Sequence, residues 1–338
     1  MKIAYLLPYF TIVSGSFGGI KMQAVQWRNL LRKMGHEVVE INPWETYDWK
    51  SFDVIHYFFF GSSFFSLYSS LKQRAPQTKF VCSPVLDPHY PLLVYKILSR
   101  ISYPKAKLFT DYAALRRYDS VFDVFLARTL YEQKFLSEAF GISSSKIRLV
   151  PLNSRFSDAE CLEQCKKESF CLHVSRICDP TKNVERLVDA ALKYNFNLVL
   201  AGASTDEFNA KLARKIESRQ NIQNLGRVSD DRLKELYSKA RVFALPSIRE
   251  GVGLVALEAA SYGCDIVITN IGGPKEYFLP NAIAVDPYNV DDIGKAVKRF
   301  LNGETYQPIL RNAIAEKYSE DKVKEKLLNI YTKIGAMH

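Results

Sequence analysis

The sequence predicts an α/β protein with two Rossmann-like domains, each a parallel sheet covered by helices. Short β-rich runs alternate with helical stretches along the chain, which is the pattern of parallel sheets with helical crossovers. Twelve such runs fall into two sets of six. At 338 residues, of which 47% are apolar, the chain is large enough for two cores of ordinary size.

The first six runs define an N-terminal domain over residues 1–152. A helix is expected at 22–34, because Gly35 follows it as a stop signal. Residues 1–8 are interpreted as a first strand and not as a signal peptide. The predicted strands of this half are 2–7, 37–42, 53–60, 79–85, 121–128 and 147–151.

The other six runs define a C-terminal domain over residues 168–317. The polar segment 153–168 is interpreted as a linker with a short charged helix, and a helix is expected at 183–193. An amphipathic helix at 318–331 follows the last strand. The predicted strands of this half are 170–176, 197–202, 222–226, 241–246, 265–269 and 282–285.

One segment of the second domain carries the strongest functional signal. Glu250 and Glu258 bracket Gly251 and Gly253, directly after an apolar run, and a helix is expected to begin at 251–253 and to end before Gly263. Backbone N–H groups at such a helix start bind anionic groups. Eight residues at about 1.5 Å each would separate the carboxylates by roughly 12 Å, beyond the ~5–9.5 Å of a hydrolase acid–base pair. They would instead hold hydroxyls at the two ends of one long ligand.

The alternative is a structural role for both acids. Glu250 would then be a solvated first-turn acid and Glu258 would face water. However, Glu258 has apolar neighbours on nearly every side, and a buried carboxylate needs a partner. A ligand-binding role is therefore the preferred interpretation.

Two cations follow the first strand of the second domain. Arg176 lies at the strand end, and Lys182 precedes the next helix, for which Asn183 is a candidate cap. An arginine fork and a lysine point charge together neutralise a diphosphate without a metal. The alternative is a pair of surface salt-bridge residues. Backbone near Val228, in the loop after the third strand of this domain, is a candidate contact for a nucleobase, or a plain loop.

Two further candidate sites lie in the first domain. Gly18 and Gly19 form a glycine-rich turn between the first strand and the first helix, where backbone can approach a phosphate. The Gly-x-Gly-x-x-Gly spacing is missing, which disfavours a nicotinamide cofactor and hence a dehydrogenase. Asp87 and His89 follow the fourth strand, where either would contact a transferred group or move a proton. A flexible turn and a structural histidine are the alternatives.

Composition bounds the remaining possibilities. The six cysteines form no Cys-x-x-Cys pair, so they are expected to be reduced, with Cys161 and Cys165 a weak metal candidate. No apolar run of about 18 residues is present, so no membrane-spanning helix is expected. There is no Asp-x-Asp motif, and neither a metal nor another cofactor is predicted.

The net charge of +10 is concentrated in the first half. Residues 1–160 hold 20 Lys and Arg against 13 Asp and Glu. The cations of one aromatic-rich stretch would meet anionic lipid or phosphate, or form a solvated basic face. The residues of this stretch are Lys96, Arg100, Lys105 and Lys107, with Tyr95, Tyr103 and Phe109. The expected location is the cytoplasm, with peripheral contact at the inner face of the membrane.

The segment from Glu250 to Glu258 resembles the Glu-x7-Glu element of the retaining GT-B glycosyltransferases of family four. Arg176 and Lys182, the glycines 18 and 19, and the segment 224–226 reinforce the resemblance in the family's order. It implies a GT-B fold, with two Rossmann-like domains whose parallel sheets face each other across a cleft. It also implies that a helix at 318–338 returns to complete the first, acceptor-binding domain.

The resemblance also implies roles for individual residues. Glu250 would hold the donor sugar, Glu258 the ribose, and Arg176 and Lys182 the diphosphate, with Val228 beside the base. Backbone at Gly18, Gly19 and 251–254 completes the donor-binding set, which includes Gly251, Val252, Gly253 and Leu254. Val252 and Asp265 depart from the Phe and Pro usual in the family, and Asp87 or His89 takes the place of its catalytic-region histidine.

The predicted function is retaining transfer of a sugar from a nucleotide-diphosphate donor to a hydroxyl of a glycan or lipid-linked acceptor, in envelope polysaccharide or glycolipid synthesis. The predicted catalytic residues are Asp87, His89, Arg176, Lys182 and Glu250. A GT-B epimerase or phosphorylase is the near alternative. A nucleic-acid-binding protein, suggested by a pI near 9.1, is the distant one, but the sequence shows no recognition motif and no nucleic-acid partner is expected.

Overall fold

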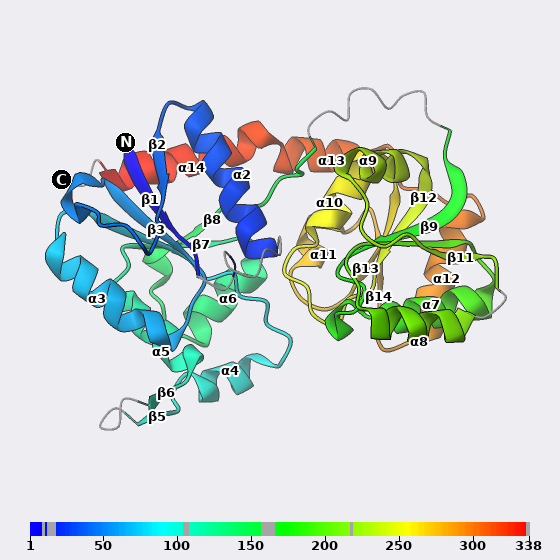
Figure 1. Cartoon of the computed structure of the whole chain (residues 1–338), viewed down its shortest axis with the longest axis horizontal. Helices are drawn as coiled ribbons and strands as arrows, with labels where there is room; N and C mark the ends of the chain where they lie inside the picture. Colours follow the sequence, from blue (N-terminus) through cyan, green and yellow to red (C-terminus); the bar gives the residue numbers. More distant parts are fainter. Residues whose placement is uncertain (9–10, 12–17, 104–107, 157–165, 217–218, 336–338) are drawn as a thin grey trace. The chain divides into compact units, whose positions relative to one another are not determined.

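The computed structural model describes residues 1–8, 11, 18–103, 108–156, 166–216 and 219–335. The chain folds into two compact units (Figure 1). Unit 1 comprises Met1–Leu152 together with Glu320–His338, and unit 2 comprises Asn153–Ser319. Within the described ranges, no helix has both the length and the apolarity needed to cross a bilayer.

Unit 1 is built on a parallel sheet of six strands in the order β2-β1-β3-β4-β7-β8. Its strands are β1 (Lys2–Leu6), β2 (Glu37–Glu40), β3 (Val54–Phe58), β4 (Lys79–Ser83), β7 (Val124–Ala127) and β8 (Ile147–Leu149). All five residues of β3 are buried, as expected for a central strand covered on both faces. A separate antiparallel pair, β5 (Ser102–Tyr103) and β6 (Leu108–Phe109), stands apart from this sheet.

The helices of unit 1 come from both ends of the chain. They are α2 (Gly19–Lys33), α3 (Phe65–Arg74), α4 (Leu92–Leu98), α5 (Asp111–Arg117), α6 (Leu130–Glu138) and α14 (Glu320–Gly335). Helices α2 and α14 lie side by side in Figure 1. The buried hydroxyl of Tyr331 on α14 bonds to Nδ1 of His56 on β3, at 2.5 Å. The last helix is thereby fixed to the central strands of unit 1.

Unit 2 is also built on a six-stranded parallel sheet, in the order β11-β10-β9-β12-β13-β14. Its strands are β9 (Glu168–Val174), β10 (Leu198–Ala201), β11 (Ile222–Asn224), β12 (Ala240–Leu245), β13 (Asp265–Thr269) and β14 (Ile283–Val285). Numbered within the unit, this order is 3-2-1-4-5-6, the order of dinucleotide-binding folds.

Helices cover both faces of the second sheet. They are α7 (Val184–Tyr194), α8 (Asp206–Ile216), α9 (Asp230–Lys239), α10 (Leu254–Ser261), α11 (Pro274–Phe278), α12 (Val290–Leu301) and α13 (Ile309–Tyr318). Figure 1 shows α7, α8 and α12 on one side of the sheet and α9, α10 and α13 on the other. A core cluster of α7 and α12 side chains packs against the strands on the first side.

The structure confirms the predicted α/β class with two parallel sheets, and each of the twelve predicted strands has a counterpart. The short β5–β6 pair was not predicted. The helix expected at 318–331 is present as α14, but it begins two residues later, at Glu320, because Ser319 is extended and Tyr318 is the last residue of α13.

Candidate functional site

The candidate site of unit 2 lies where the strand order of its sheet reverses. Strands β9 and β12 are neighbours there, and the chain continues from them in opposite directions across the sheet. Ligands of open α/β sheets bind beyond the carboxyl ends of the strands at such a point. The chain after β9 carries Arg176 and Lys182, and the chain after β12 carries Glu250 and the glycines 251 and 253. The topology therefore brings the two predicted segments to the same edge.

A buried histidine links the two strands just below this edge. Nδ1 of His173 on β9 donates to the carbonyl of Ala244 on β12 at 2.8 Å, since a carbonyl can only accept. Nε2 then accepts from the Ser175 hydroxyl at 2.7 Å. Burial lowers the pKa of His173 to about 4, so its ring is neutral at pH 7. His173 is a structural clamp between the two strands that carry the site.

The loop between β9 and α7 is held rigidly to the loop after β12. Asn183 has a left-handed backbone (φ 61°), and its amide donates to the carbonyls of Pro246 at 2.9 Å and Pro287 at 2.6 Å. The carbonyl of Thr181 accepts from the backbone N–H of Ile248 at 2.8 Å. Asn183 was predicted as a side-chain cap of α7. It occupies the cap position, but its side chain makes no capping bond because it reaches across to the neighbouring loops.

These loop contacts place Lys182 against Glu250. The ammonium of Lys182 lies 2.8 Å from Oε2 of Glu250, and the Ser247 hydroxyl lies 3.4 Å from the same oxygen. Both side chains are largely but not completely buried, with 24% and 13% of their surface exposed. The structure thus brings together a cation and an acid, 68 positions apart in the sequence, at the sheet edge.

Helix α10 begins later than the sequence suggested. Its first residue is Leu254, and Gly253 precedes it with a left-handed backbone (φ 85°) that favours glycine. Gly251 and Val252 are buried in the turn before the helix. The 12 Å separation expected for the two acids applied the helical rise to every residue from 250 to 258. Glu250 lies in the loop before α10, as expected, but the helix begins only at Leu254, so that rise does not hold over residues 250–253.

Glu258 is buried and fully engaged. Its oxygens accept from Arg155, with Nε to Oε1 at 2.5 Å and Nη2 to Oε2 at 3.1 Å, and Oε2 also accepts from the Tyr237 hydroxyl at 3.0 Å. Burial raises the pKa of Glu258 above that of an exposed glutamate, while the Arg155 guanidinium opposes this shift. With only 1% of the side chain exposed, the alternative in which Glu258 faces water is wrong. Three accepted bonds leave room for about one more at this carboxylate.

Arg155 and Tyr237 were not found by sequence reasoning. Arg155 falls in the segment interpreted as a linker, and its partner lies 103 positions away. Burial alone would lower the pKa of Arg155, but the hydrogen bond and charge of Glu258 raise it above its ordinary value. The one available signal was the apolar surrounding of Glu258, which required a cationic partner somewhere in the chain.

The remaining predicted residues of unit 2 lie at the same edge of the sheet but are less constrained. Arg176 is exposed just beyond β9, and none of the described residues forms a hydrogen bond or ion pair with its side chain. Val228 is half-buried in the loop between β11 and α9. Leu254 is half-buried at the first position of α10.

A buried ion cluster supports Asp87 in unit 1. Asp87 follows β4, and its Oδ1 accepts from Nη2 of Arg128 at 2.7 Å. Arg128 also bonds Oε2 of Glu132 at 2.9 Å, and Glu132 in turn accepts from the backbone N–H of Leu86 at 2.6 Å. Burial alone would lower the pKa of Arg128, but Glu132 and Asp87 raise it. Sequence reasoning missed both Arg128 and Glu132, which fix the chain that carries Asp87.

The other candidates of unit 1 are less defined. His89 is half-buried, with its Nδ1 3.2 Å from the hydroxyl of the buried Tyr95. Gly18 is the N-cap of α2 and Gly19 its first residue, so this helix starts earlier than predicted. A Cβ at either glycine would meet no atom within 4 Å, so no close approach of backbone requires glycine there. The rest of the predicted turn, residues 12–17, lies outside the described residues.

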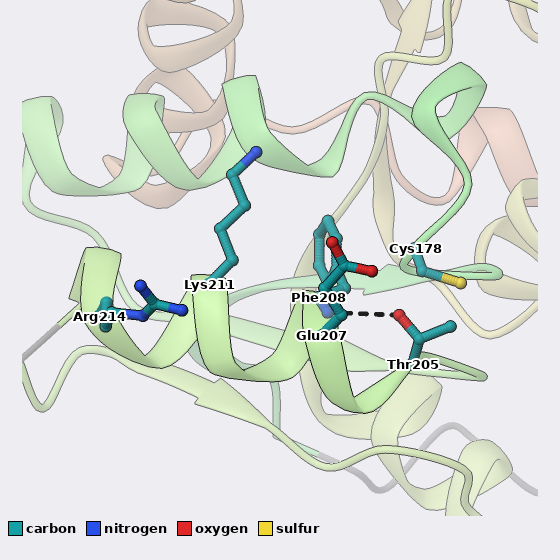
Figure 2. A pocket seen from close by; sticks show the side chains of 6 residues that line it. All are labelled: Cys178, Thr205, Glu207, Phe208, Lys211 and Arg214. Carbon is teal, nitrogen blue, oxygen red and sulfur yellow. Dashed lines mark hydrogen bonds between the residues drawn. The ribbon is translucent and has the colours of Figure 1, made fainter.

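A separate pocket lies on unit 2 along α8. It is lined by Cys178, Thr205, Glu207, Phe208, Lys211 and Arg214. Figure 2 shows Lys211 and Arg214 projecting from successive turns of α8, and the Thr205 hydroxyl accepting from the backbone N–H of Phe208 at 3.2 Å. None of the predicted site residues lines this pocket.

The weak metal candidate receives no support. Cys161 and Cys165 lie outside the described residues. Over the part of the chain that the structure describes, no group of three His, Cys, Asp or Glu side chains is arranged to hold a metal. Cys82, Cys171, Cys178 and Cys264 are free thiols.

Comparison with known proteins relates the second unit to glycosyltransferases. Residues 159–320 match the family model of the glycosyl transferases group 1. An uncharacterized glycosyltransferase of Methanocaldococcus jannaschii is 34% identical over 175 residues, 48% of this chain and 45% of the relative. The O-antigen chain mannosyltransferase B of Escherichia coli is 28% identical over 191 residues, 52% of this chain and 50% of the relative. The chain is thus matched over about half the length of these curated relatives.

Solved structures match over the whole chain at low identity. The sucrose-phosphate synthase of Thermosynechococcus elongatus superposes with a TM-score of 0.75 at 16% identity, covering 100% of both chains. The Anabaena HepE protein in complex with UDP superposes with a TM-score of 0.71 at 16% identity, covering 98% of this chain and 100% of that one. At such identity these matches establish the fold. The chain has the GT-B fold, and its residues 159–320 match the glycosyl transferases group 1 family.

Proposed function

We propose that this chain transfers a sugar, with retention at the anomeric carbon, from a nucleotide-diphosphate sugar to an acceptor hydroxyl. The observation that carries the proposal is the Lys182–Glu250 pair at the point where the strand order of unit 2 reverses. A cation and an acid at this edge suit the diphosphate and the sugar hydroxyls of one donor. The family match of residues 159–320 supports the same reaction class.

The pair suggests how the donor is held. Lys182 would neutralise the departing diphosphate together with the exposed guanidinium of Arg176, and no metal would be needed. Glu250 would orient Lys182 and accept from a sugar hydroxyl. Backbone N–H groups at 251–253 add to the phosphate site. The acceptor hydroxyl would attack on the face that the diphosphate leaves and pass its proton to a phosphate oxygen.

Glu258 is proposed to hold the ribose, with Val228 beside the base. Arg155 and Tyr237 already use three of the acceptor positions of the Glu258 carboxylate. A ribose hydroxyl would therefore bind at the remaining position on Oε1 or displace part of the Arg155 contact. In either case Arg155 determines the orientation of the carboxylate that meets the nucleoside.

The acceptor is proposed to be a glycan or a lipid-linked glycan of an envelope polysaccharide. The relatives named O-antigen mannosyltransferases support this choice, and suggest a hexose donor. Unit 1 would bind the acceptor. Asp87, fixed by the buried Arg128, and His89, beside Tyr95, are the groups proposed to contact the transferred sugar.

A thermal-shift panel of nucleoside diphosphates and their sugars tests donor binding. One nucleotide at 100 times its Kd should stabilise the protein by about 2.7 kcal/mol. Lys182→Met should raise the Kd of the protein for this nucleotide at least tenfold. Lys211→Met is the matched control, since Lys211 also pairs with a glutamate, at 2.7 Å, but on α8. Loss of binding with Lys211→Met and not with Lys182→Met would place the nucleotide in the α8 pocket and refute the proposed site.

Product analysis tests the reaction itself. Incubation of the stabilising nucleotide sugar with glycan acceptors should give a glycoside of unchanged anomeric configuration, and chelation of divalent metals should leave the rate unchanged. Lys182→Ala should reduce the rate at least tenfold, about 1.4 kcal/mol in the barrier. Donor isomerisation would indicate an epimerase, phosphate-dependent cleavage a phosphorylase, and an inverted product would refute retention.

A further inference from the structure

Helix α4 of unit 1 presents an apolar surface that the core does not use. Its buried side is fixed by Tyr95, which is 1% exposed, and by the Ser99 hydroxyl, which donates to the carbonyl of Ala139 at 2.8 Å. Because these residues are one helical turn apart, the opposite side of the helix faces away from the core. The exposed apolar side chains on and beside α4 are Tyr90, Leu93, Val94, Ile97 and Ile101.

The exposed residues form one stripe. Leu93 and Ile97 lie one turn apart on α4, Ile101 follows four positions later just beyond the helix, and each of the three residues is 52–65% exposed. Single exposed apolar residues are ordinary, but a contiguous group marks a contact surface. In Figure 1, α4 lies with the β5–β6 pair at one edge of unit 1. We call this stripe, with Tyr90 and Val94, the α4 patch.

The charges around the α4 patch have one sign. Lys96 is exposed on α4, and Arg100 is exposed in the turn directly after the helix. No Asp or Glu occurs anywhere between residues 88 and 110. The nearest acids on each side are already bonded, Asp87 to Arg128 and Asp111 to the Ser62 backbone and hydroxyl. On the neighbouring helix α6, Lys134 and Glu138 are exposed and offset each other.

We propose that the α4 patch docks unit 1 on an anionic lipid surface. Exposed aliphatic side chains beside lysine and arginine, with no acid among them, suit the boundary between acyl chains and anionic headgroups. Lysine is depleted at protein interfaces, whereas on a membrane its stem can lie along the apolar surface with the ammonium among the phosphates. The small size of the α4 patch implies reversible binding.

The structure changes which residues make this surface. The sequence suggested an aromatic and basic stretch, but Tyr95 is part of the core, and the exposed groups are mainly aliphatic. Lys105 and Lys107 lie outside the described residues. The inference stands independently of the proposed sugar transfer, because lipid binding is measured without turnover.

Co-sedimentation of the full chain with vesicles tests the docking. The wild type should bind vesicles of phosphatidylcholine with 30% phosphatidylglycerol at low salt, and bind pure phosphatidylcholine at least tenfold more weakly. Leu93→Ser with Ile97→Ser should reduce binding at least tenfold. Lys96→Gln with Arg100→Gln should reduce it about fivefold per cation and remove most of its salt dependence.

Two matched controls separate the α4 patch from general effects. Ile309→Ser removes an aliphatic residue of α13 with 62% exposure, close to that of Leu93. Lys322→Gln with Lys326→Gln removes two exposed cations at the same spacing on α14. Both controls should bind as the wild type does, and far-UV circular dichroism should be unchanged in every variant.

Two results would overturn the proposal. The first is an absence of wild-type binding to anionic vesicles, or binding that the α4 substitutions leave unchanged. The second is self-association in sedimentation velocity that Leu93→Ser with Ile97→Ser abolishes, without any vesicle binding. This result would make the α4 patch an interface between copies of the chain.

Discussion

Removing Arg155 should destabilise unit 2 more than removing any comparable exposed cation. Arg155→Ala leaves the Glu258 carboxylate, with 1% of its side chain exposed, bonded only to Tyr237. Breaking a buried pair by removing one partner costs roughly 3–5 kcal/mol, because the remaining charge is buried without compensation. Arg155 itself is 21% exposed, so part of this cost is relieved by water, and about 3 kcal/mol is expected.

Arg299→Ala is the matched control. Arg299 makes the same bidentate contact with Glu304, with Nε 2.7 Å and Nη2 2.6 Å from the carboxylate oxygens. The side chains of this pair are 53% and 32% exposed. Exposed pairs contribute roughly 0–1 kcal/mol. Both pairs lie in unit 2, so the difference between the variants measures the effect of burial on one geometry.

Urea unfolding followed by far-UV circular dichroism measures both variants. With a slope of about 1–3 kcal/mol per molar urea, Arg155→Ala should lower the midpoint of the unit 2 transition by about 1 M or more. The three tryptophans, at 27, 44 and 49, are all in unit 1, so tryptophan fluorescence reports separately on that unit.

The cost of Arg155→Ala should depend on pH. Without Arg155, burial raises the pKa of Glu258 above its unfolded value, and only the hydrogen bond from the Tyr237 hydroxyl still opposes this shift. Below the unfolded pKa of about 4.3, the glutamate is protonated in both the folded and the unfolded state and does not destabilise the fold. As the pH rises through the higher folded pKa, the buried carboxylate must ionise and the fold loses stability. The difference from the wild type should therefore be small at pH 4 and largest at pH 7. A cost at pH 7 no greater than that of Arg299→Ala, or one independent of pH, would refute the reasoning.

Three further outcomes are expected. His173 has a pKa of about 4 in the folded protein and about 6.5 in the unfolded chain, so the protein should lose up to roughly 3 kcal/mol of stability as the pH falls from 6.5 to 4. In His173→Asn the urea midpoint should fall less over this pH range than in the wild type. An equal fall in both proteins would contradict this. Gly253→Ala should lower the free energy of unfolding by about 1–2 kcal/mol because the backbone is left-handed, and by more because the new Cβ would lie 3.3 Å from the Leu245 side chain. Gly303 also has a positive φ, but a Cβ there meets no atom within 4 Å, so Gly303→Ala should cost less in the same urea assay. Tyr331→Phe should cost about 1–3 kcal/mol, because the buried Nδ1 of His56 loses the Tyr331 hydroxyl while Nε2 keeps that of Ser83. The loss should be seen in tryptophan fluorescence, and an unchanged fluorescence midpoint would show that this bond adds nothing.

The strands of both sheets could be predicted from the sequence because strands that are buried on both faces consist mostly of apolar residues. Apart from His56 in β3 and Arg241 in β12, the residues of these two strands are apolar or aromatic, which makes both easy to recognise. The β5–β6 pair has two residues per strand, too few for any pattern to show. The start of α10 was misplaced because Gly253 adopts a left-handed backbone, a choice that composition permits but does not reveal.

The candidate site was predicted only in part. Lys182 and Glu250 were each recognised from their position after a strand, and the sheet topology brings them together. Arg155 could not be predicted, because it is 103 positions away from Glu258 and only the path of the folded chain brings the two side chains together. The residues next to Arg155 in the sequence give no sign of this pairing. Arg128 was missed for a similar reason, since its role follows from contacts with residues at 86–87, more than 40 positions away.

The return of α14 to unit 1 has a consequence for synthesis. The ribosome completes residue 152 long before it reaches Tyr331, whose hydroxyl meets His56. At roughly 5–20 residues per second, the intervening polypeptide takes about 10–40 s to emerge. During that interval the nascent N-terminal half lacks its closing helix, and the side of α2 that α14 later covers is open to chaperones. Unit 2 is contiguous in the chain, so it can mature first although it is translated second.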